Sequence, residues 1–272
     1  MMNIRDSVAV VTGAGSGIGA AVSVELARRG AKMIAMVDQS DHVLEVAKGV
    51  QRTGNVALQT FQGDTTDPSF RRGVFDEVCA KYSVPNICVP AAGIARDALA
   101  VRVNKETKEP EIYPLETFRQ VVEVDLVAPV YWALELVARV AKARFEKGLK
   151  RWQAEEGIQG VVIFIGSISS AGIKGQIAYS ASKAGLEGVA NTLGKEATYF
   201  GVRCSVIHPG FTDTPMVRAL GEEYIRKHIL PETQLGRLIK PEEIADAICF
   251  MISNSAVTGQ LWADAGWHPS AA

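Results

Sequence analysis

The sequence predicts an α/β protein built on a doubly wound parallel sheet of about seven strands, with helices on both faces. Short β-rich apolar runs alternate with longer helical patterns along most of the 272 residues. Runs such as 161–165 are apolar on both faces, which suits strands covered on both sides. A glycine-rich turn joins the first of these runs to the first helical pattern.

The elements follow one another in a regular order. Each expected strand is a short run of apolar, mostly β-favouring residues, and these runs are 8–12, 33–37, 56–62, 87–89, 161–165, 203–207 and 260–263. Each expected helix has apolar residues at helical spacing, and these stretches are 18–29, 43–52, 70–81, 115 to about 147, 179–200 and 241–253. Two polar stretches, 102–113 and 147–160, are predicted to be surface excursions within a single domain spanning residues 1–272.

The composition is that of an ordinary globular protein, with 47% hydrophobic and 22% charged residues. A formal net charge of −1 gives no pull toward nucleic acid or an anionic membrane. No signal peptide and no run long enough to span a bilayer is recognisable. The four cysteines and four histidines lack metal-ligand spacing. We therefore expect a cytoplasmic protein with reduced thiols, a small-molecule partner and no metal site.

The segment Thr12-Gly-Ala-Gly-Ser-Gly-Ile-Gly19 follows a strand and opens a helix. Glycines at such a joint allow a tight turn and close approach of the backbone to a pyrophosphate, which the helix N-terminus then holds. This context predicts a Rossmann-type dinucleotide site. The loop residues expected to contact the cofactor are Gly13, Ser16, Gly17, Ile18 and Gly19.

An acid, Asp38, ends the second predicted strand, nineteen residues after Gly19. A carboxylate there accepts hydrogen bonds from the adenosine ribose and repels a 2′-phosphate, so the sequence predicts NAD rather than NADP. After the third strand, Asp64 and Thr65 stand where a side chain could reach the adenine. A simple turn or cap acid is the alternative for Asp64.

A second segment points to acid–base chemistry. Tyr179 and Lys183 are four residues apart on a predicted helix, hence on one face. A nearby ammonium lowers the pKa of a phenol, so that Tyr179 can exchange a proton with an alcohol or alkoxide. Ser167 follows a strand end and can hydrogen-bond the reacting oxygen, with Ser169 and Ser170 as rivals.

Together these motifs resemble the short-chain dehydrogenase/reductase family, from about residue 8 to residue 266. The family motifs appear in order as Thr12–Gly19, Ser167 with Tyr179 and Lys183, and Pro209-Gly-Phe-Thr-Asp-Thr214. The resemblance implies that Lys183 also binds the nicotinamide ribose. It extends the expected cofactor contacts to Ala92, Gly93, Pro209, Gly210, Phe211, Thr212 and Thr214. It also implies a homotetramer or homodimer, in which Trp262 and Trp267 could serve an interface or the core.

The chain departs from the family pattern in three places. Pro90-Ala91 stands where the family usually has two asparagines before Ala-Gly, which removes two bracing amides. A fourth catalytic residue, usually Asn, is Asp125 here, so an acceptor remains and a donor is lost. Ser167 precedes Tyr179 by twelve residues, one fewer than usual. We expect activity to survive with an altered pH profile.

The pattern around Tyr179 and the 102–113 insert is similar to that of 3-oxoacyl-thioester (ACP or CoA) reductases, which makes these thioesters the first substrate expectation. Cyclic, steroid-like or sugar-derived alcohols are the alternatives. The substrate lid is expected at about 214–235, where apolar and charged residues alternate at helical spacing. A different reading is a non-catalytic NAD-binding partner or sensor protein, supported by the substitutions at residues 90, 91 and 125.

Overall fold

The computed structural model describes residues 2–267, so His268 lies outside the described part. A seven-stranded sheet runs through it in the order β3-β2-β1-β4-β7-β8-β9, and the paired strands are parallel. The strands of this sheet are β1 (Val8–Thr12), β2 (Met33–Asp38), β3 (Ala57–Gln62), β4 (Ile87–Pro90), β7 (Gly160–Ile165), β8 (Val202–Pro209) and β9 (Gly259–Ala263). The predicted fold class is confirmed.

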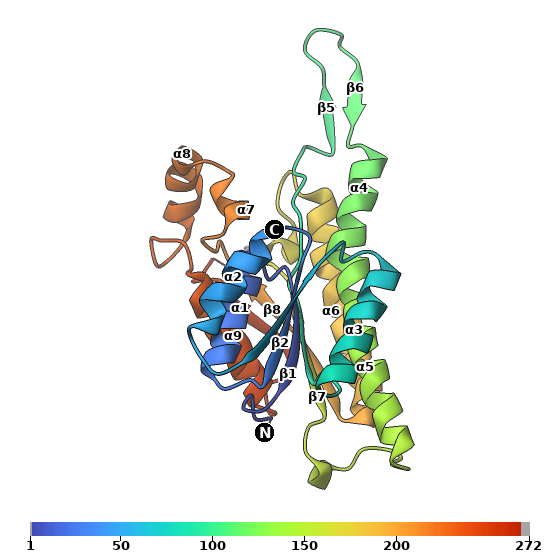
Figure 1. Ribbon diagram of the computed structural model, residues 1–272. Helices are drawn as coiled ribbons and strands as arrows, with labels where there is room; N and C mark the ends of the chain where they lie inside the picture. Colours follow the sequence, from blue (N-terminus) through green and yellow to red (C-terminus); the bar gives the residue numbers. More distant parts are fainter. Residues whose placement is uncertain (1, 268–272) are drawn as a thin grey trace.

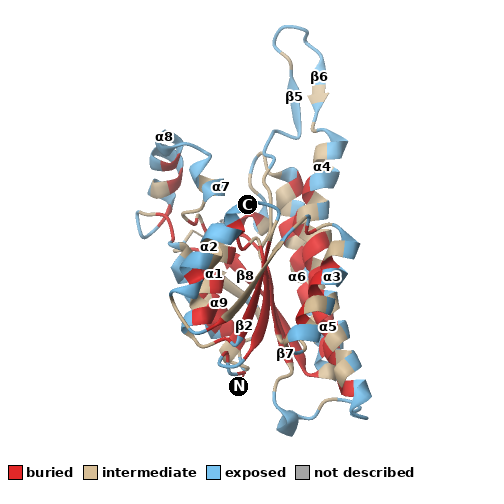
Figure 2. Ribbon diagram, in the orientation of Figure 1, coloured by how far each residue is buried: buried red, intermediate tan, exposed pale blue. Residues whose placement is uncertain are grey.

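Helices cover both faces of the sheet (Figure 1). One face carries α1 (Gly17–Arg28), α2 (His42–Gln51) and α9 (Pro241–Ser253). The other carries α3 (Pro68–Lys81), α4 (Leu115–Val122), α5 (Ala128–Glu146) and α6 (Ile177–Ala197). An apolar cluster fills each interface, and the central strands are buried on both sides (Figure 2). This explains why residues 8–12 and 161–165 are continuously apolar.

The predicted helix 115–147 is interrupted. Between α4 and α5 the chain makes a π-helical turn, η1 (Glu123–Val127), whose only buried residue is Asp125. Single π-turns inside helices are often found at functional sites. The widened turn carries Asp125 toward the sheet, while α4 and α5 continue on either side.

The stretch 102–113, expected to be a turn-like excursion, contains a hairpin instead. Strands β5 (Val101–Val103) and β6 (Pro110–Ile112) pair antiparallel and project beyond the body of the protein (Figure 1). Their turn is closed by Asn104, whose side-chain oxygen accepts hydrogen bonds from the backbone N–H groups of Glu106 and Thr107. The alternation of Val101, Arg102 and Val103 was too short a signal to predict a strand.

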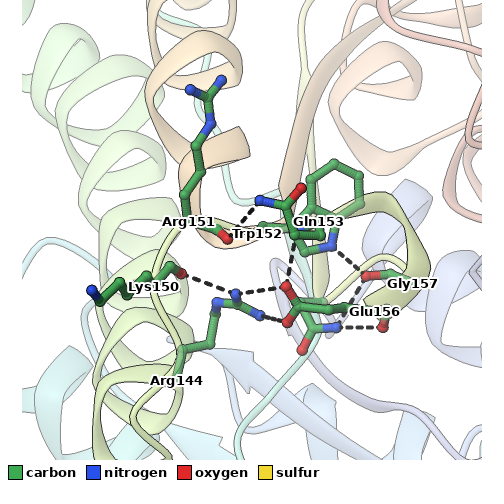
Figure 3. Close-up of polar contacts among 8 residues, drawn as sticks. Arg144, Lys150, Arg151, Trp152, Gln153, Glu156 and Gly157 are labelled. Carbon is green, nitrogen blue, oxygen red and sulfur yellow. Dashed lines mark hydrogen bonds and ion pairs between the residues drawn. The ribbon is translucent and has the colours of Figure 1, made fainter.

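The second excursion, 147–160, folds back as a strap at the opposite end of the sheet. It includes a short 3₁₀ turn, η2 (Ala154–Glu156). The buried Arg144 of α5 donates hydrogen bonds to both carboxylate oxygens of Glu156, at 2.6 and 3.2 Å (Figure 3). Trp152 donates its indole N–H to the Gly157 carbonyl oxygen at 2.7 Å. The strap is therefore held by Arg144 at the end of α5 and by contacts among its own residues.

The expected lid region, 214–235, is a series of short turns rather than one helix. They are α7 (Pro215–Arg218), α8 (Glu222–Tyr224), η5 (Ile225–Ile229) and η6 (Leu230–Glu232). Gly221, at φ +90°, separates the first two. Ile225 and Ile229 are buried against Leu238, which gives the region a small apolar core. None of the helices in residues 2–267 is long and apolar enough to cross a membrane.

Candidate active site

A cleft of about 690 Å³ opens at the carboxyl ends of the central strands. Ligands of doubly wound sheets bind at this edge, where the strand order reverses, here between β1 and β4. Most of the residues that the sequence singled out line this cleft: Gly13, Ser16, Gly17, Ile18, Gly19, Asp38, Asp64, Thr65, Ala92, Gly93, Tyr179, Lys183 and Thr214.

The glycine loop passes close to neighbouring backbone. A Cβ built on Gly13, at φ +65°, would lie 2.7 Å from the Ala92 nitrogen, and one on Gly19 would lie 2.3 Å from the Gly13 oxygen. Ser16 is the N-cap of α1 and makes no side-chain cap hydrogen bond, and the first turn carries no acid. The first N–H groups of a helix have no hydrogen-bond partners within it. In α1, no acidic side chain of the first turn lies beside them. This is a cradle suited to a phosphate.

Asp38 is held by the loop that it faces. Its Oδ2 accepts a hydrogen bond from the Gly15 N–H at 2.8 Å, and its Oδ1 accepts one from the Ser40 N–H at 2.9 Å. The next residues along the cleft wall are the neutral Gln39 and Ser40. The orientation of the Asp38 carboxylate at the cleft is therefore fixed by two hydrogen bonds. Neither Gln39 nor Ser40 places a positive charge beside it.

Asp64 makes a local turn as well as lining the cleft. Its Oδ1 accepts hydrogen bonds from the N–H and the hydroxyl of Thr66, both at 2.8 Å. The neighbouring Thr65 is buried, and its carbonyl oxygen accepts the indole N–H of Trp132 at 2.9 Å. One oxygen of the Asp64 carboxylate thus serves the turn, and a contact of this residue with the adenine stays a prediction.

Ser167 and Tyr179 are brought together by two elements. Ser167 caps the 3₁₀ turn η3 (Ile168–Ala171) after β7, and Tyr179 lies in the first turn of α6. Both side chains line the same small cavity. Of the rivals, Ser169 donates to Gln176 at 2.8 Å and Ser170 donates to the Ser167 carbonyl oxygen at 2.7 Å. Ser167 is therefore the serine that faces the tyrosine.

Lys183 lies one helical turn beyond Tyr179 and is buried. Its Nζ donates to the Ile165 carbonyl oxygen at 3.1 Å and lies 3.8 Å from Asp125 Oδ2. It is also 5.4 Å from the centre of the Tyr179 ring. The ammonium thus has three neighbours at the floor of the cleft: a carbonyl, a carboxylate and an aromatic ring.

The pKa of Tyr179 is raised rather than lowered in the chain by itself, which corrects the expectation from the Tyr–Lys spacing. Burial of the phenol is the largest cause, and the negative charge of Asp125 adds to it. The Ser167 hydroxyl lowers the pKa of the phenol, but this effect is outweighed. The Lys183 ammonium is shared with Asp125 and Ile165, so its pull on the phenol is weakened.

Asp125 lines no part of the cleft and acts from behind Lys183. It is 0% exposed, and its Oδ1 accepts a hydrogen bond from the Ile94 N–H at 2.8 Å. Its Oδ2 faces Lys183 without a hydrogen bond. Burial raises the pKa of this carboxyl, against the opposing charge of Lys183. The orphaned Oδ2 occupies the place where an asparagine would carry its N–H₂ group.

A second cavity, of about 130 Å³, meets the cleft at Tyr179. It contains the remaining predicted residues, Ser167, Pro209, Gly210, Phe211 and Thr212. Met216, Val217 and Leu220, from the segment 214–235, also line it. Two wall residues that the sequence reasoning missed form a polar bridge across it, because Gln176 donates to Asp97 Oδ2 at 2.7 Å.

The comparisons with known proteins agree with this geometry. The family model described as short chain dehydrogenase matches residues 7–225. The chain belongs to the short-chain dehydrogenase/reductase family. It is 32% identical to the 3-oxoacyl-[acyl-carrier-protein] reductase of Escherichia coli (strain K12) over 262 residues, covering 95% of this chain and 96% of that one. It is therefore an oxidoreductase of a family that uses a nicotinamide dinucleotide.

Two further curated members of this short-chain dehydrogenase family match along nearly the full length. A (3R)-3-hydroxyacyl-CoA dehydrogenase of Canis lupus familiaris is 31% identical, with 95% of this chain and 94% of that one covered. A cis-4-hydroxycyclohexanecarboxylate dehydrogenase of Sinomonas cyclohexanicum is also 31% identical, with 97% and 96% covered. A short-chain dehydrogenase/reductase from Mycobacterium marinum has the same fold, with a TM-score of 0.81 and 23% identity over 97% of this chain and 96% of that one.

Pro90 and Ala91 stand where the resemblance to the family led us to expect two asparagines. The Thr12 hydroxyl accepts a hydrogen bond from the Ala92 N–H at 3.2 Å, which still ties the end of β1 to the segment after β4. Gln120, Glu123 and Val124 also line the cleft, and the sequence reasoning did not find them. Glu123 and Val124 lie in the π-turn, which no sequence pattern predicted, whereas Gln120 lies in α4.

Proposed function

We propose that the chain is an NAD(H)-dependent oxidoreductase that interconverts a secondary alcohol and a ketone. The observation that carries this proposal is the meeting of the cofactor cleft and the smaller cavity at one phenol, that of Tyr179. A group that must exchange a proton with substrate while a cofactor lies alongside needs access to both spaces.

Asp38 supports NAD over NADP in this proposal. A ribose 2′-hydroxyl can donate to a carboxylate, whereas a 2′-phosphate would meet its negative charge. The Gly15 and Ser40 N–H groups hold the carboxylate, so it cannot easily turn away from a bound ribose. The glycine cradle and the α1 N-terminus would hold the pyrophosphate, and Lys183 the nicotinamide ribose.

When bound, NAD(H) supplies or accepts the hydride. Tyr179 gives its proton to the oxygen that becomes an alkoxide during reduction, or takes one from the alcohol during oxidation. Ser167 donates a hydrogen bond to the same oxygen and stabilises its developing charge. Asp125 acts through Lys183. The Lys183 ammonium is held in place by Asp125 and by the Ile165 carbonyl oxygen. Pro209 to Thr214 would hold the cofactor carboxamide.

A 3-oxoacyl thioester is the first substrate class to test, because two of the relatives are named for 3-oxoacyl and 3-hydroxyacyl thioesters. The cyclic alcohol in the name of a third supports the runner-up. The small cavity beside Tyr179 has many apolar wall residues beside its Gln176–Asp97 bridge, which suits either an acyl chain or a ring.

The test is a panel of ketones assayed with NADH and NADPH. It includes acetoacetyl-coenzyme A and a 4-oxocyclohexanecarboxylate. We expect turnover with NADH on at least one member, and a Tyr179→Phe variant that loses about 100-fold or more in kcat while still binding NADH. Unchanged turnover in Tyr179→Phe would remove the acid–base assignment. NADH binding without turnover on any ketone would favour a non-catalytic role.

A further inference from the structure

A buried histidine lies directly behind the serine proposed to orient the substrate. His208, in β8, is 0% exposed, and its ring stacks on Trp262 of β9 with centroids 4.2 Å apart and planes at 14°. It immediately precedes Pro209 and Gly210, which line the cavity. Buried histidines usually have hydrogen-bonding partners, and the two ring nitrogens of His208 face different neighbours.

The Nδ1 side of the ring faces the backbone of Ser167. Nδ1 lies 3.1 Å from the Ser167 carbonyl oxygen and 3.2 Å from the Ser170 hydroxyl. The Ser170 hydroxyl donates to the same carbonyl at 2.7 Å. Because a carbonyl oxygen only accepts, the contact with Nδ1 is a hydrogen bond when Nδ1 carries the ring proton.

The chain leaves room for this contact at the residue between β7 and Ser167. A Cβ built on Gly166 would lie 2.7 Å from His208 Nδ1, so a side chain at 166 would displace the ring. Gly166 also donates its N–H to the Ile207 carbonyl oxygen at 2.7 Å, which fixes the end of β7 against β8. The His208 ring can therefore reach the Ser167 backbone because residue 166 has no side chain.

The Nε2 side of the ring faces Glu187 of α6. Nε2 lies 3.8 Å from Glu187 Oε1, beyond hydrogen-bond distance, and Glu187 Oε2 accepts a hydrogen bond from Gln260 of β9 at 3.0 Å. Burial lowers the pKa of His208, which favours the neutral ring with one proton. That single proton is used on the side where an acceptor lies within hydrogen-bond distance, at Ser167.

We propose that His208 is a positioning residue for the reaction, with its Nδ1–H holding the Ser167 carbonyl oxygen and thereby the direction in which the Ser167 hydroxyl points. The backbone geometry of Ser167 determines where that hydroxyl lies, because its oxygen also accepts the Ser169 N–H at 3.0 Å within the same turn. With the ring removed, the carbonyl keeps the hydroxyl and the N–H of Ser170, both within its own 3₁₀ turn, and loses its contact with β8. This inference rests on the proposed role of Ser167.

The test is a double-mutant cycle on kcat with NADH and the best-turned-over ketone of the panel. His208→Ala is expected to lower kcat by about fivefold to tenfold while changing the KM for NADH by less than about twofold. In a Ser167→Ala background the same change is expected to lower kcat by less than about twofold, because the group through which His208 acts is gone. The exposed His42→Ala is the matched histidine control.

Rescue separates positioning from simple packing. His208→Asn can place a side-chain N–H near the Nδ1 position and is expected to recover most of the lost kcat, whereas His208→Gln, which reaches the Nε2 position, is not. Thermal unfolding and NADH fluorescence confirm that each variant is folded and binds cofactor.

Three results would overturn the inference. They are an unchanged kcat in His208→Ala, an equal fall in kcat in the wild-type and Ser167→Ala backgrounds, or a kcat of His208→Asn no higher than that of His208→Ala. The equal fall would mean a structural role of the stacked ring. Wild-type kcat in Ser167→Ala would instead remove the serine assignment, and this inference with it. A fall in Ser167→Ala without one in His208→Ala overturns this inference alone.

Discussion

Asp125 places a negative charge behind the proposed acid–base pair, Tyr179 and Lys183, at a residue where the resemblance to the family led us to expect a neutral Asn. The carboxylate is fully buried, 3.8 Å from the Lys183 ammonium, and its charge raises the pKa of Tyr179. A phenol with a raised pKa keeps its proton at neutral pH. It is then ready to donate that proton during ketone reduction and poor at accepting one during alcohol oxidation.

Replacing Asp125 by Asn should therefore make alcohol oxidation less dependent on alkaline pH. The substitution removes a negative charge that disfavours the phenolate and leaves the Lys183 ammonium without a competing carboxylate, so both effects lower the pKa of Tyr179. We expect the rising limb of kcat/KM for oxidation to move to lower pH, with kcat within about tenfold of the wild type.

The measurement is the pH–rate profile in both directions, with Glu116→Gln, an exposed carboxylate on α4, as the control that should leave it unchanged. An inactive Asp125→Asn protein with intact NADH binding would show that the carboxylate is required, and a profile identical to the wild type would show that its charge does not reach Tyr179.

At the scale of elements, the strap between α5 and β7 depends on one buried cation. Arg144 is 4% exposed and donates to Glu156 and to the Lys150 carbonyl oxygen, which joins the end of α5 to the strap (Figure 3). Truncation to Ala would leave the Lys150 carbonyl without this donor and the Glu156 carboxylate with the Gln153 N–H but without its cation. Because the strap lies at the end of the sheet away from the cleft, stability should fall while chemistry persists.

Arg144→Ala is expected to lower the Tm by about 5 °C and to leave kcat at 25 °C within about twofold of the wild type. Arg151→Ala, an exposed arginine in the same strap, is the matched control and should shift the Tm by less than about 2 °C. Thermal unfolding followed by circular dichroism gives the comparison. Equal shifts in the two variants would mean that the arginine at 144 does not order the strap.

Elements with strong local patterns were predictable from the sequence, and those decided by tertiary contacts were not. The predicted strand 8–12 matches β1, and the predicted helix 241–253 matches α9. The π-turn at 123–127 was missed because its residues suit a continuous helix, and only the burial of Asp125 beside Lys183 distinguishes it. The β5–β6 hairpin was missed because three-residue strands are too short for a period-two pattern.

The residues of the candidate site also fall into a group that local motifs predict and a group that long-range packing places. The glycine loop, Asp38 and the Tyr179–Lys183 spacing are short-range motifs, so their residues could be named from the sequence. The position of Gln120 on the cleft wall and of His208 behind Ser167 depends on packing between distant elements, which spacing does not encode. The direction of the Tyr179 pKa shift was also missed, because it depends on burial and on a charge fifty-four residues away.

At the scale of the whole molecule, the cleft proposed to hold the cofactor is lined by residues at the carboxyl ends of β1, β2, β3, β4 and β7 and in the segment after β8. A ligand held there contacts most of the sheet and does not bind the unfolded chain. Ligand at about 100 times its Kd adds about 2.7 kcal/mol to the free energy of unfolding. For a chain of this size such a gain corresponds to a Tm increase of about 5 °C or more.

Thermal unfolding with nucleotides therefore tests the cofactor preference without any knowledge of the substrate. NADH should raise the Tm by this amount, and NADPH at equal concentration should raise it much less, because its 2′-phosphate would face the Asp38 carboxylate that Gly15 and Ser40 hold in place. Asp38→Asn removes the repelling charge, so the two shifts should converge. Asp41→Asn, an exposed carboxylate at the start of α2 that does not line the cleft, should keep the wild-type difference. Equal shifts with NADH and NADPH in the wild type would contradict the assignment of Asp38, since the carboxylate would then not decide which nucleotide the sheet edge holds.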